Sequence, residues 1–372
     1  MTFFLVSGFV ESLLGFNGPR ITALQALGQQ VHVDAPDLPP GDPIPVQLEV
    51  RGLKVHNIPL RRTGTNSFAD FRALFSPLRV MCRVLPQWVL GYTIKPVIYG
   101  SLAAWQAGMP RRFALITGLG YAFQGEGKRG RLQSIVQRLY GLALSRVGKV
   151  FFQNPDDREL FRQRGILADA TPSCVVSGSG VDVARFALAP LPSGLPRFLL
   201  IARLLGDKGV REYAKAARRV HLQHPGAQFA LAGWIDSNPD AIAQQELDAW
   251  VADGTLVYLG RLSDVRPAIA ASTVYVLPSY REGTPRTVLE AMSMGRPIIT
   301  TDTSGCRETV VDGDNGFLVP IKSVDALQKV MMEFIDDQAL APRMWQRSRQ
   351  IAQEKYDVHK VNALMLREMG VA

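Results

Sequence analysis

Cysteine is scarce in this chain of 372 residues. The three cysteines, Cys82, Cys174 and Cys306, lie far apart and form neither a CxxC pair nor a cluster with histidine. A disulfide framework and a structural zinc site both need closely spaced ligands, so neither is expected here. A reducing cytoplasm is the compartment that this cysteine usage favours.

Long hydrophobic runs are missing as well. The most apolar internal stretch, residues 88–105, is interrupted by Lys95 and Pro96, and it is a poor membrane span because a spanning helix needs about 20 apolar residues. The apolar start of the sequence has no basic residue ahead of it and no small-residue cleavage site, so it indicates a buried strand rather than a signal peptide. We expect no transmembrane helix.

Acidic residues are nearly absent from residues 61–149, where only Asp70 and Glu126 accompany 14 lysines and arginines. Residues 1–190 hold 21 basic and 12 acidic residues, whereas residues 191–372 hold 21 of each, so the net charge of +9 lies in the first half. Aromatic residues are interleaved with the basic ones. An anionic surface is the partner that this favours, and nucleic acid and an anionic membrane both offer dense phosphate. A solvated basic face with aromatic residues in the core is the alternative.

Short apolar runs alternate with helical patterns in both halves. The clearest predicted strands cover residues 3–8, 29–36, 92–98, 112–118 and 149–154, then 197–205, 227–234, 256–262, 274–280 and 297–302. This alternation predicts an α/β protein with two doubly wound, Rossmann-like domains facing a cleft, with ligands at the carboxyl ends of the strands. A proline-rich linker near residues 188–196 sets the expected domains at 1–190 and 191–345, and we expect residues 346–372 to form a C-terminal helix that returns to the first domain.

Two cations follow the first predicted strand of the second half. Arg203 ends this strand, and Lys208 lies in the loop before the next helix. Arginine chelates phosphate oxygens and lysine acts as a point charge, so the pair suits a diphosphate and the charge that grows on a departing nucleotide diphosphate. The alternative is structural: Arg203 pairs with a carboxylate and Lys208 is a solvated turn residue.

A second candidate segment joins a strand to a helix. It reads Glu282-Gly283-Thr284-Pro285-Arg286 and leads into a helix that contains Glu290. The glycine allows close backbone approach, and the helix start offers unpaired amides to an anion. Glu282 suits a sugar hydroxyl and Glu290 a ribose diol, although a helix glutamate in an ion pair is the structural alternative for Glu290.

Together these segments resemble family 4 of the retaining glycosyltransferases with the GT-B fold, above all the bacterial branch that builds O-antigen, capsule or N-glycan oligosaccharides on polyprenyl diphosphate. The resemblance rests on ARLLGDKG, PSYREGTPRTVLEAMSMGRPIITTD and GCRETVVDGDNGFLVP in the second half, and on LLGFNGPRI, YTIKPVIYGSLAAW and ITGLGYAF in the first. It extends over most of the chain.

The resemblance implies roles for individual residues. Arg203, Lys208 and Glu282 would be catalytic, holding the donor diphosphate and the donor sugar. The full donor site would comprise Gly18, Arg203, Lys208, Arg261, Leu262, Glu282, Gly283, Thr284, Arg286 and Glu290. Arg261 and Leu262 would line the base pocket, and Gly18 would approach the phosphate from the first domain. Thr117, Gly118 and Gly120 would lie on the acceptor side.

The expected partners follow from the same resemblance: a UDP-hexose or UDP-N-acetylhexosamine donor, a polyprenyl-diphosphate-linked saccharide acceptor, an anionic membrane surface, and no nucleic acid. We expect a cytoplasmic enzyme, peripheral on the inner face of the plasma membrane, with Arg111, Arg112, Lys128 and Arg129 facing the membrane. The alternatives are a sugar-nucleotide epimerase or glycosyl phosphorylase of the same fold, and a non-enzymatic module that binds membrane or RNA.

Two features limit the chemistry. Several relatives have a histidine in the loop that here reads Thr117-Gly118-Leu119-Gly120-Tyr121, and none of the five histidines is a candidate base. The leaving phosphate would then take the acceptor proton. Asp312-Gly313-Asp314 superficially matches a DxD metal motif, but its context predicts a turn. We expect no bound metal and no cofactor.

Overall fold

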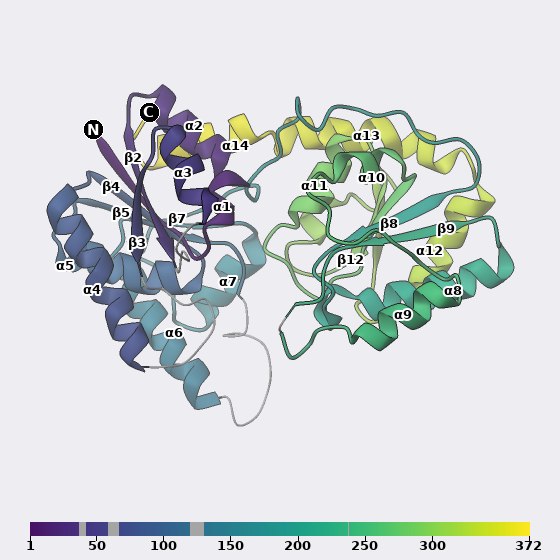
Figure 1. Cartoon of the computed structure of the whole chain (residues 1–372), viewed down its shortest axis with the longest axis horizontal. Coiled ribbons are helices and arrows are strands. Elements are labelled where there is room, and N and C mark those ends of the chain that lie inside the picture. Colours follow the sequence, from purple (N-terminus) through teal and green to yellow (C-terminus); the bar gives the residue numbers. More distant parts are fainter. Residues whose placement is uncertain (37–41, 59–66, 120–129, 237) are drawn as a thin grey trace. The chain divides into compact units, whose positions relative to one another are not determined.

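A computed structural model describes residues 1–36, 42–58, 67–119, 130–236 and 238–372. The chain divides into two compact units (Figure 1). Met1–Ser179 and His359–Ala372 form the first unit, and Gly180–Val358 form the second.

The described part of the first unit holds a seven-stranded parallel sheet in the order β3-β2-β1-β4-β5-β6-β7. The strands are β1 (Thr2–Val6), β2 (Gln30–Pro36), β3 (Lys54–Ile58), β4 (Trp88–Tyr92), β5 (Arg111–Ile116), β6 (Lys149–Phe152) and β7 (Ser173–Val175). The helices are α1 (Glu11–Leu14), α2 (Gly18–Ala26), α3 (Pro43–Val50), α4 (Ser67–Val84), α5 (Ser101–Gln106), α6 (Gly130–Leu144), α7 (Pro155–Gln163) and α14 (Val358–Glu368), with a π-helical turn at Pro96–Gly100.

Both faces of the first sheet are covered, which explains its continuous apolar strands. On β1, Phe3 and Leu5 pack with α2, α3 and α14, whereas Phe4 and Val6 pack with α4 and α5 on the opposite face. The C-terminal helix α14 thus belongs to the core of the first unit.

The second unit repeats this architecture with a six-stranded parallel sheet, among its described residues, in the order β10-β9-β8-β11-β12-β13. The strands are β8 (Arg197–Ile201), β9 (Gln228–Ala232), β10 (Val257–Tyr258), β11 (Val274–Leu277), β12 (Ile298–Thr301) and β13 (Gly316–Val319). The helices are α8 (Val210–Gln223), α9 (Gln244–Ala252), α10 (Arg266–Ala270), α11 (Arg286–Ser293), α12 (Val324–Asp336) and α13 (Leu340–Lys355), with 3-10 turns at Gly206–Lys208 and Arg307–Thr309.

The order of the strands sets the place of each ligand site. Strand order reverses between β1 and β4 in the first sheet and between β8 and β11 in the second. In open parallel sheets, ligands bind beyond the carboxyl ends of the strands at such a point. The loops after β8 and β11 in the second unit are therefore the first place to search.

The unit boundaries differ from the expected 190/191 and 345/346. Residues 180–196 pack on the second unit, because Val181 and Phe186 lie in its core. The helix α13 stays there as well, with Ile351 and Ala352 against α11, so that only residues 359–372 return to the first unit.

One predicted strand is wrong. Residues 92–98 do not form a strand, because β4 is Trp88–Tyr92 and the chain then turns into the π-helical segment at Pro96. Thr93 has φ of 69°, a left-handed conformation that ends the strand, and Pro96 has no N–H to continue a ladder. The strand at this place is the buried run Trp88–Tyr92, which overlaps the predicted strand only at Tyr92.

Candidate functional site

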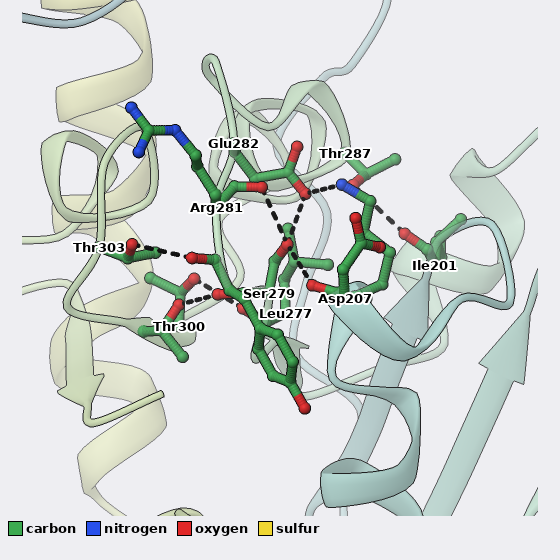
Figure 2. Close-up of polar contacts among 12 residues, drawn as sticks. Ile201, Asp207, Leu277, Ser279, Arg281, Glu282, Thr287, Thr300 and Thr303 are labelled. Atoms are coloured by element: carbon green, nitrogen blue, oxygen red, sulfur yellow. Dashed lines mark hydrogen bonds and ion pairs between the residues drawn. The ribbon is translucent and has the colours of Figure 1, made fainter. Parts of the chain in front are cut away.

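The loops after β8 and β11 meet at the switch point of the second sheet (Figure 2). The amide of Tyr280 donates to the Asp207 carbonyl at 2.8 Å. Gly209 has φ of 70°, and a Cβ there would lie 2.1 Å from the Pro278 carbonyl oxygen. Only glycine permits this approach, which holds the two loops together.

Lys208 and Glu282 form an ion pair across these loops. Lys208 Nζ donates to Glu282 Oε1 at 2.5 Å, and both side chains are mostly buried. Burial by itself would lower the pKa of Lys208, but the Glu282 carboxylate raises it above its usual value. Lys208 is therefore a fixed cation, not the solvated turn residue of the structural alternative.

Arg203 follows β8 and pairs with an acid that the sequence did not point to. Its Nη1 donates to Asp236 Oδ2 at 2.8 Å, and Asp236 lies in the loop after β9. The two side chains are about a third and a fifth exposed. The carboxylate partner that the structural alternative expects for Arg203 is therefore present. A diphosphate would have to compete with Asp236 for the guanidinium.

Glu282 is held by neighbours on both sides. Its amide donates to the Ser304 carbonyl at 3.0 Å, and the Ser279 hydroxyl contacts its Oε1 at 2.9 Å. Figure 2 shows Glu282 turned toward Ser279, while the Arg281 side chain points away from it. Because Ser279 has no exposed surface, the carboxylate rests on a rigid support.

Three hydroxyls at the end of β12 fix the loop that carries Glu282 (Figure 2). Thr300 donates to the Leu277 carbonyl at 2.7 Å and Thr303 to the Tyr280 carbonyl at 3.0 Å. Thr301 donates to the Ser279 carbonyl. They lie within the predicted segment PIITTD and just after it, but no sequence signal distinguished them from ordinary strand threonines.

Arg286 and Glu290 are joined on α11. Arg286 Nε donates to Glu290 Oε1 at 2.7 Å, an i, i+4 pair. Glu290 is 6% exposed, and burial raises its pKa in spite of Arg286. The structural alternative for Glu290, a helix glutamate in an ion pair, is therefore present. Gly283 and Thr284 lie between Glu282 and the start of α11.

Arg261 and Leu262 follow β10 beside an exposed aromatic residue. The Arg261 guanidinium lies 4.7 Å from the ring centroid of Trp234, which follows β9 and is 40% exposed. The ring attracts the guanidinium electrostatically, so Trp234 helps to position Arg261. Trp234 was missed in the sequence because it falls at the end of an apolar strand pattern.

The predicted residues of the first unit lie at its strand and helix ends. Gly18 is the first residue of α2, and a Cβ there would be 3.7 Å from the Leu13 carbonyl oxygen, an ordinary contact. Thr117 and Gly118 follow β5, and Gly118 has φ of 138°. Gly120 lies outside the described residues, as do Lys128 and Arg129.

A tight contact marks the switch point of the first sheet. A Cβ on Gly8, after β1, would lie 2.2 Å from Thr93 Oγ1. Thr93 holds a left-handed conformation that is an outlier for a β-branched residue. Both were missed, because neither residue type signals strain in the sequence.

Arg111 and Arg112 lie at the amino end of β5, away from the strand carboxyl ends. Arg111 is 4.9 Å from the ring centroid of Trp88 and donates to the Gly370 carbonyl at 3.1 Å. Arg112 Nε donates to the Arg146 carbonyl at 2.6 Å. Both arginines therefore have structural partners as well as exposed surface.

Two histidines form a partly buried pair in the first unit. His32 Nδ1 and His56 Nε2 are 2.9 Å apart, and the rings stack 5.1 Å apart beside Phe4. Burial lowers the pKa of His32 to about 4 and also lowers that of His56. The neutral forms are therefore favoured at pH 7, and the pair has a structural partner in Phe4.

The candidate DxD segment forms a turn, as expected. Gly313 has φ of 78°, Asp312 accepts from the Leu318 amide, and Asp314 pairs with Arg347 at 2.6 Å. Over the described residues, no three histidine, cysteine, aspartate or glutamate side chains gather as a metal site would require. In the same residues, no helix is long and apolar enough to span a membrane.

Comparisons with known proteins match both units. Residues 21–178 fit the model of a glycosyl transferase 4-like domain, and residues 195–337 fit that of the glycosyl transferases group 1. A sucrose-phosphate synthase from Thermosynechococcus elongatus superposes with a TM-score of 0.81 at 18% identity, covering 99% of this chain and 98% of that one.

Two curated relatives act on lipid-linked sugars according to their names. One is the N,N'-diacetylbacillosaminyl-diphospho-undecaprenol alpha-1,3-N-acetylgalactosaminyltransferase of Campylobacter jejuni subsp. jejuni serotype O:2, 28% identical over 88% of each chain. The other is the UDP-Gal:alpha-D-GlcNAc-diphosphoundecaprenol alpha-1,3-galactosyltransferase of Escherichia coli, 26% identical over 73% of this chain and 72% of that protein.

Two Rossmann-like units, each with a parallel sheet, form the GT-B fold, and the two matching family models make the chain a glycosyltransferase. The chain belongs to the family built from a glycosyl transferase 4-like domain followed by a group 1 domain.

Proposed function

We propose that this enzyme moves a hexose or N-acetylhexosamine from a UDP-sugar to a polyprenyl-diphosphate-linked saccharide, with retention of anomeric configuration. The Lys208–Glu282 pair at the second switch point carries the proposal. This pair places a cation that can neutralise a leaving diphosphate beside a carboxylate that can accept a hydrogen bond from a sugar hydroxyl. The names of the Campylobacter and E. coli relatives support the donor and acceptor classes.

The donor diphosphate binds between Arg203 and Lys208. As the bond from the anomeric carbon to the phosphate oxygen breaks, negative charge grows on the leaving UDP, and the two cations stabilise that charge more than they stabilise the intact donor. Glu282, Gly283 and Thr284 hold the sugar. Gly18 of the first unit approaches the phosphate.

The nucleoside occupies the other loops of the second unit. Glu290 accepts from the ribose diol, with Arg286 holding the carboxylate in place at 2.7 Å. Arg261 and Leu262 line the base, and the exposed ring of Trp234 supports the Arg261 guanidinium at 4.7 Å. A planar support of this kind suits a stacked base.

The acceptor hydroxyl attacks from the side of the departing phosphate. Retention then follows, because the new bond forms on the face that the leaving group vacates. A phosphate oxygen of UDP takes the hydroxyl proton, so the chain needs no basic side chain and no bound metal for the transfer. Thr117, Gly118 and Gly120 of the first unit are proposed for the acceptor side.

A helix layer with almost no acidic residues, α4, α5 and α6, supports peripheral binding to an anionic membrane, on the inner face of the plasma membrane. Residues 75–119 and 130–149 contain no aspartate or glutamate. Exposed apolar side chains lie on α4, α5 and α6, namely Phe75, Trp105, Ile135 and Leu142. Exposed arginines accompany them, namely Arg79, Arg83, Arg138 and Arg146. Such a mixture suits lipid headgroups.

The test is release of UDP from a panel of UDP-sugars, with and without a polyprenyl-diphosphate-linked saccharide. We expect UDP release that requires the lipid-linked acceptor, and a product whose anomeric coupling constant matches that of the donor. Conversion of the donor sugar without release would indicate an epimerase. Transfer to inorganic phosphate alone would indicate a phosphorylase, and tighter binding to RNA than to anionic vesicles would favour the non-enzymatic alternative.

A further inference from the structure

The Glu282 carboxylate uses its two oxygens unequally. Oε1 lies 2.5 Å from Lys208 Nζ and 2.9 Å from Ser279 Oγ. Oε2 takes no part in these two contacts, and Figure 2 shows it turned away from both neighbours. One oxygen is therefore anchored, and the other is open to a ligand hydroxyl.

Lys208 interacts with two anions in the proposed reaction, the Glu282 carboxylate and the donor diphosphate. In the free chain its ammonium donates to Glu282. A bound diphosphate carries more negative charge than one carboxylate, so it draws the ammonium and weakens the hold on Glu282. The carboxylate then needs a second anchor if it is to keep its place at the donor sugar.

Ser279 is the residue placed to be that anchor. Its hydroxyl has three acceptors within reach: the Asp207 carbonyl at 3.2 Å, the Arg281 carbonyl at 3.3 Å and Glu282 Oε1 at 2.9 Å. A hydroxyl has one proton to donate, and the charged, closest acceptor forms the strongest bond. The proton therefore goes to Glu282.

The backbone around Ser279 is rigid. Thr301 donates to the Ser279 carbonyl. The preceding residue, Pro278, is held by the close approach of Gly209. A hydroxyl on such a support keeps its position when a neighbouring lysine moves.

On the basis of the proposed function, we propose that Ser279 is a positioning residue, whose hydroxyl holds Glu282 Oε1 when Lys208 turns to the donor diphosphate, so that Oε2 stays directed at the donor sugar. Ser279 does not touch the substrate. Its effect passes through Glu282 alone.

The test compares Ser279→Ala with wild type in sugar transfer and in UDP binding. We expect kcat to fall about tenfold, the size of one lost hydrogen bond to a charged group. The affinity for UDP, measured by calorimetry, should stay within about twofold, because Lys208 and Arg203 are unchanged. Ser272→Ala is the matched control: it removes another buried serine hydroxyl of the same unit, bonded to the Ile269 carbonyl, and should leave kcat as in wild type.

A second measurement needs no turnover. In protein labelled with carbon-13 at the glutamate carboxyls, Glu282→Gln identifies the Glu282 resonance, and its chemical shift at constant pH reports the hydrogen bonds that the carboxylate accepts. Loss of the Ser279 donor changes that environment, so the resonance should move in Ser279→Ala and move less far in Ser279→Cys, whose thiol is a weak donor.

The outcomes separate the two proposals. An unmoved Glu282 resonance, together with kcat equal to that of Ser272→Ala, overturns the role of Ser279 even if wild type transfers sugar. A shifted Glu282 resonance in a chain that transfers no sugar overturns the proposed function and supports only the hydrogen bond between Ser279 and Glu282. Loss of UDP binding in both Ser279→Ala and Ser279→Cys would also overturn the inference, because it would show a role beyond Glu282.

Discussion

The two units share one sheet architecture but carry different side chains in the loops after their strands. In the second unit, the loops at the switch point bring Arg203, Lys208 and Glu282 into ion pairs. In the first unit, the three residues that follow each of β1, β4 and β5 include one charge, Lys95, among serine, threonine, glycine and apolar residues. Among the described residues of that unit, Arg79, Arg83 and Arg138 lie instead on its helices, and Arg111 and Arg112 at the amino end of β5.

This difference teaches how one fold can serve the two kinds of ligand in the proposed function. A site for a nucleotide diphosphate needs fixed charges, and paired side chains keep these charges ordered before the ligand arrives. A site for a lipid-linked saccharide needs hydroxyl and backbone groups near the sugar, with its charges placed toward the membrane. Substitutions in the two units should therefore impair different properties: turnover and UDP binding in the second unit, and membrane binding in the first.

The largest effect is expected from Lys208→Ala. Removing the ammonium takes away a contact that strengthens as UDP leaves, so turnover should fall about 100-fold or more. Steady-state kinetics at saturating donor measures this. Lys215→Ala, which removes an exposed lysine of α8, is the control and should have no effect. Unchanged turnover in Lys208→Ala would remove Lys208 from the donor site.

Glycine substitutions compare the two units directly. Gly209→Ala puts a Cβ against the Pro278 carbonyl at a left-handed φ, so the second unit should lose at least about 2 kcal/mol of unfolding free energy. Gly18→Ala, at ordinary contact distance in a helix, should leave stability within about 1 kcal/mol. Thermal unfolding followed by circular dichroism measures both, and equal losses would contradict the assigned geometry.

A smaller effect is expected from Glu290→Gln. Loss of the charged acceptor for the ribose diol should weaken UDP binding about tenfold, as measured by calorimetry, while Arg286→Lys should weaken it less. If UDP binds the Gln variant as tightly as wild type, Glu290 does not hold the ribose.

The same variant tests a pH dependence. Burial raises the pKa of Glu290 above 4.5 in the folded chain, so the folded state binds the proton more tightly than the unfolded state does. Its contribution to stability is present below pH 4.5 and is lost as pH rises through the folded pKa. Denaturant unfolding across this pH range should show that the unfolding free energy of Glu290→Gln falls less with rising pH than that of wild type. An equal fall in the two proteins would contradict the raised pKa of Glu290.

The smallest effect concerns the membrane. Arg138→Ser on α6 should weaken co-sedimentation with anionic vesicles about fivefold, since one basic residue near such a surface contributes about 1 kcal/mol. Binding should fall as salt shortens the screening length from about 10 Å at 0.1 M to about 3 Å at 1 M. Arg218→Ser on α8 of the second unit should have no effect. Equal binding to neutral and anionic vesicles would reject the electrostatic account.

Much of the architecture was predictable because it rests on local patterns. The strand predicted over residues 227–234 contains β9, Gln228–Ala232, and the strand predicted over residues 112–118 overlaps β5, Arg111–Ile116. The strand error at residues 92–98 has a local cause as well, since a short apolar run carries no period that separates strand from helix.

The sequence by itself determined the α/β class, the two repeated halves and the positions of Arg203, Lys208, Glu282 and Glu290 in loops or helices at strand ends. It did so because strand and helix periodicity and the order of motifs are properties of neighbouring residues. Only the tertiary structure decided the partners: Asp236 for Arg203, Ser279 for Glu282, and Trp234 for Arg261. These pairs join loops that parallel strands bring together from distant parts of the chain, and no local pattern records which side chains will meet there.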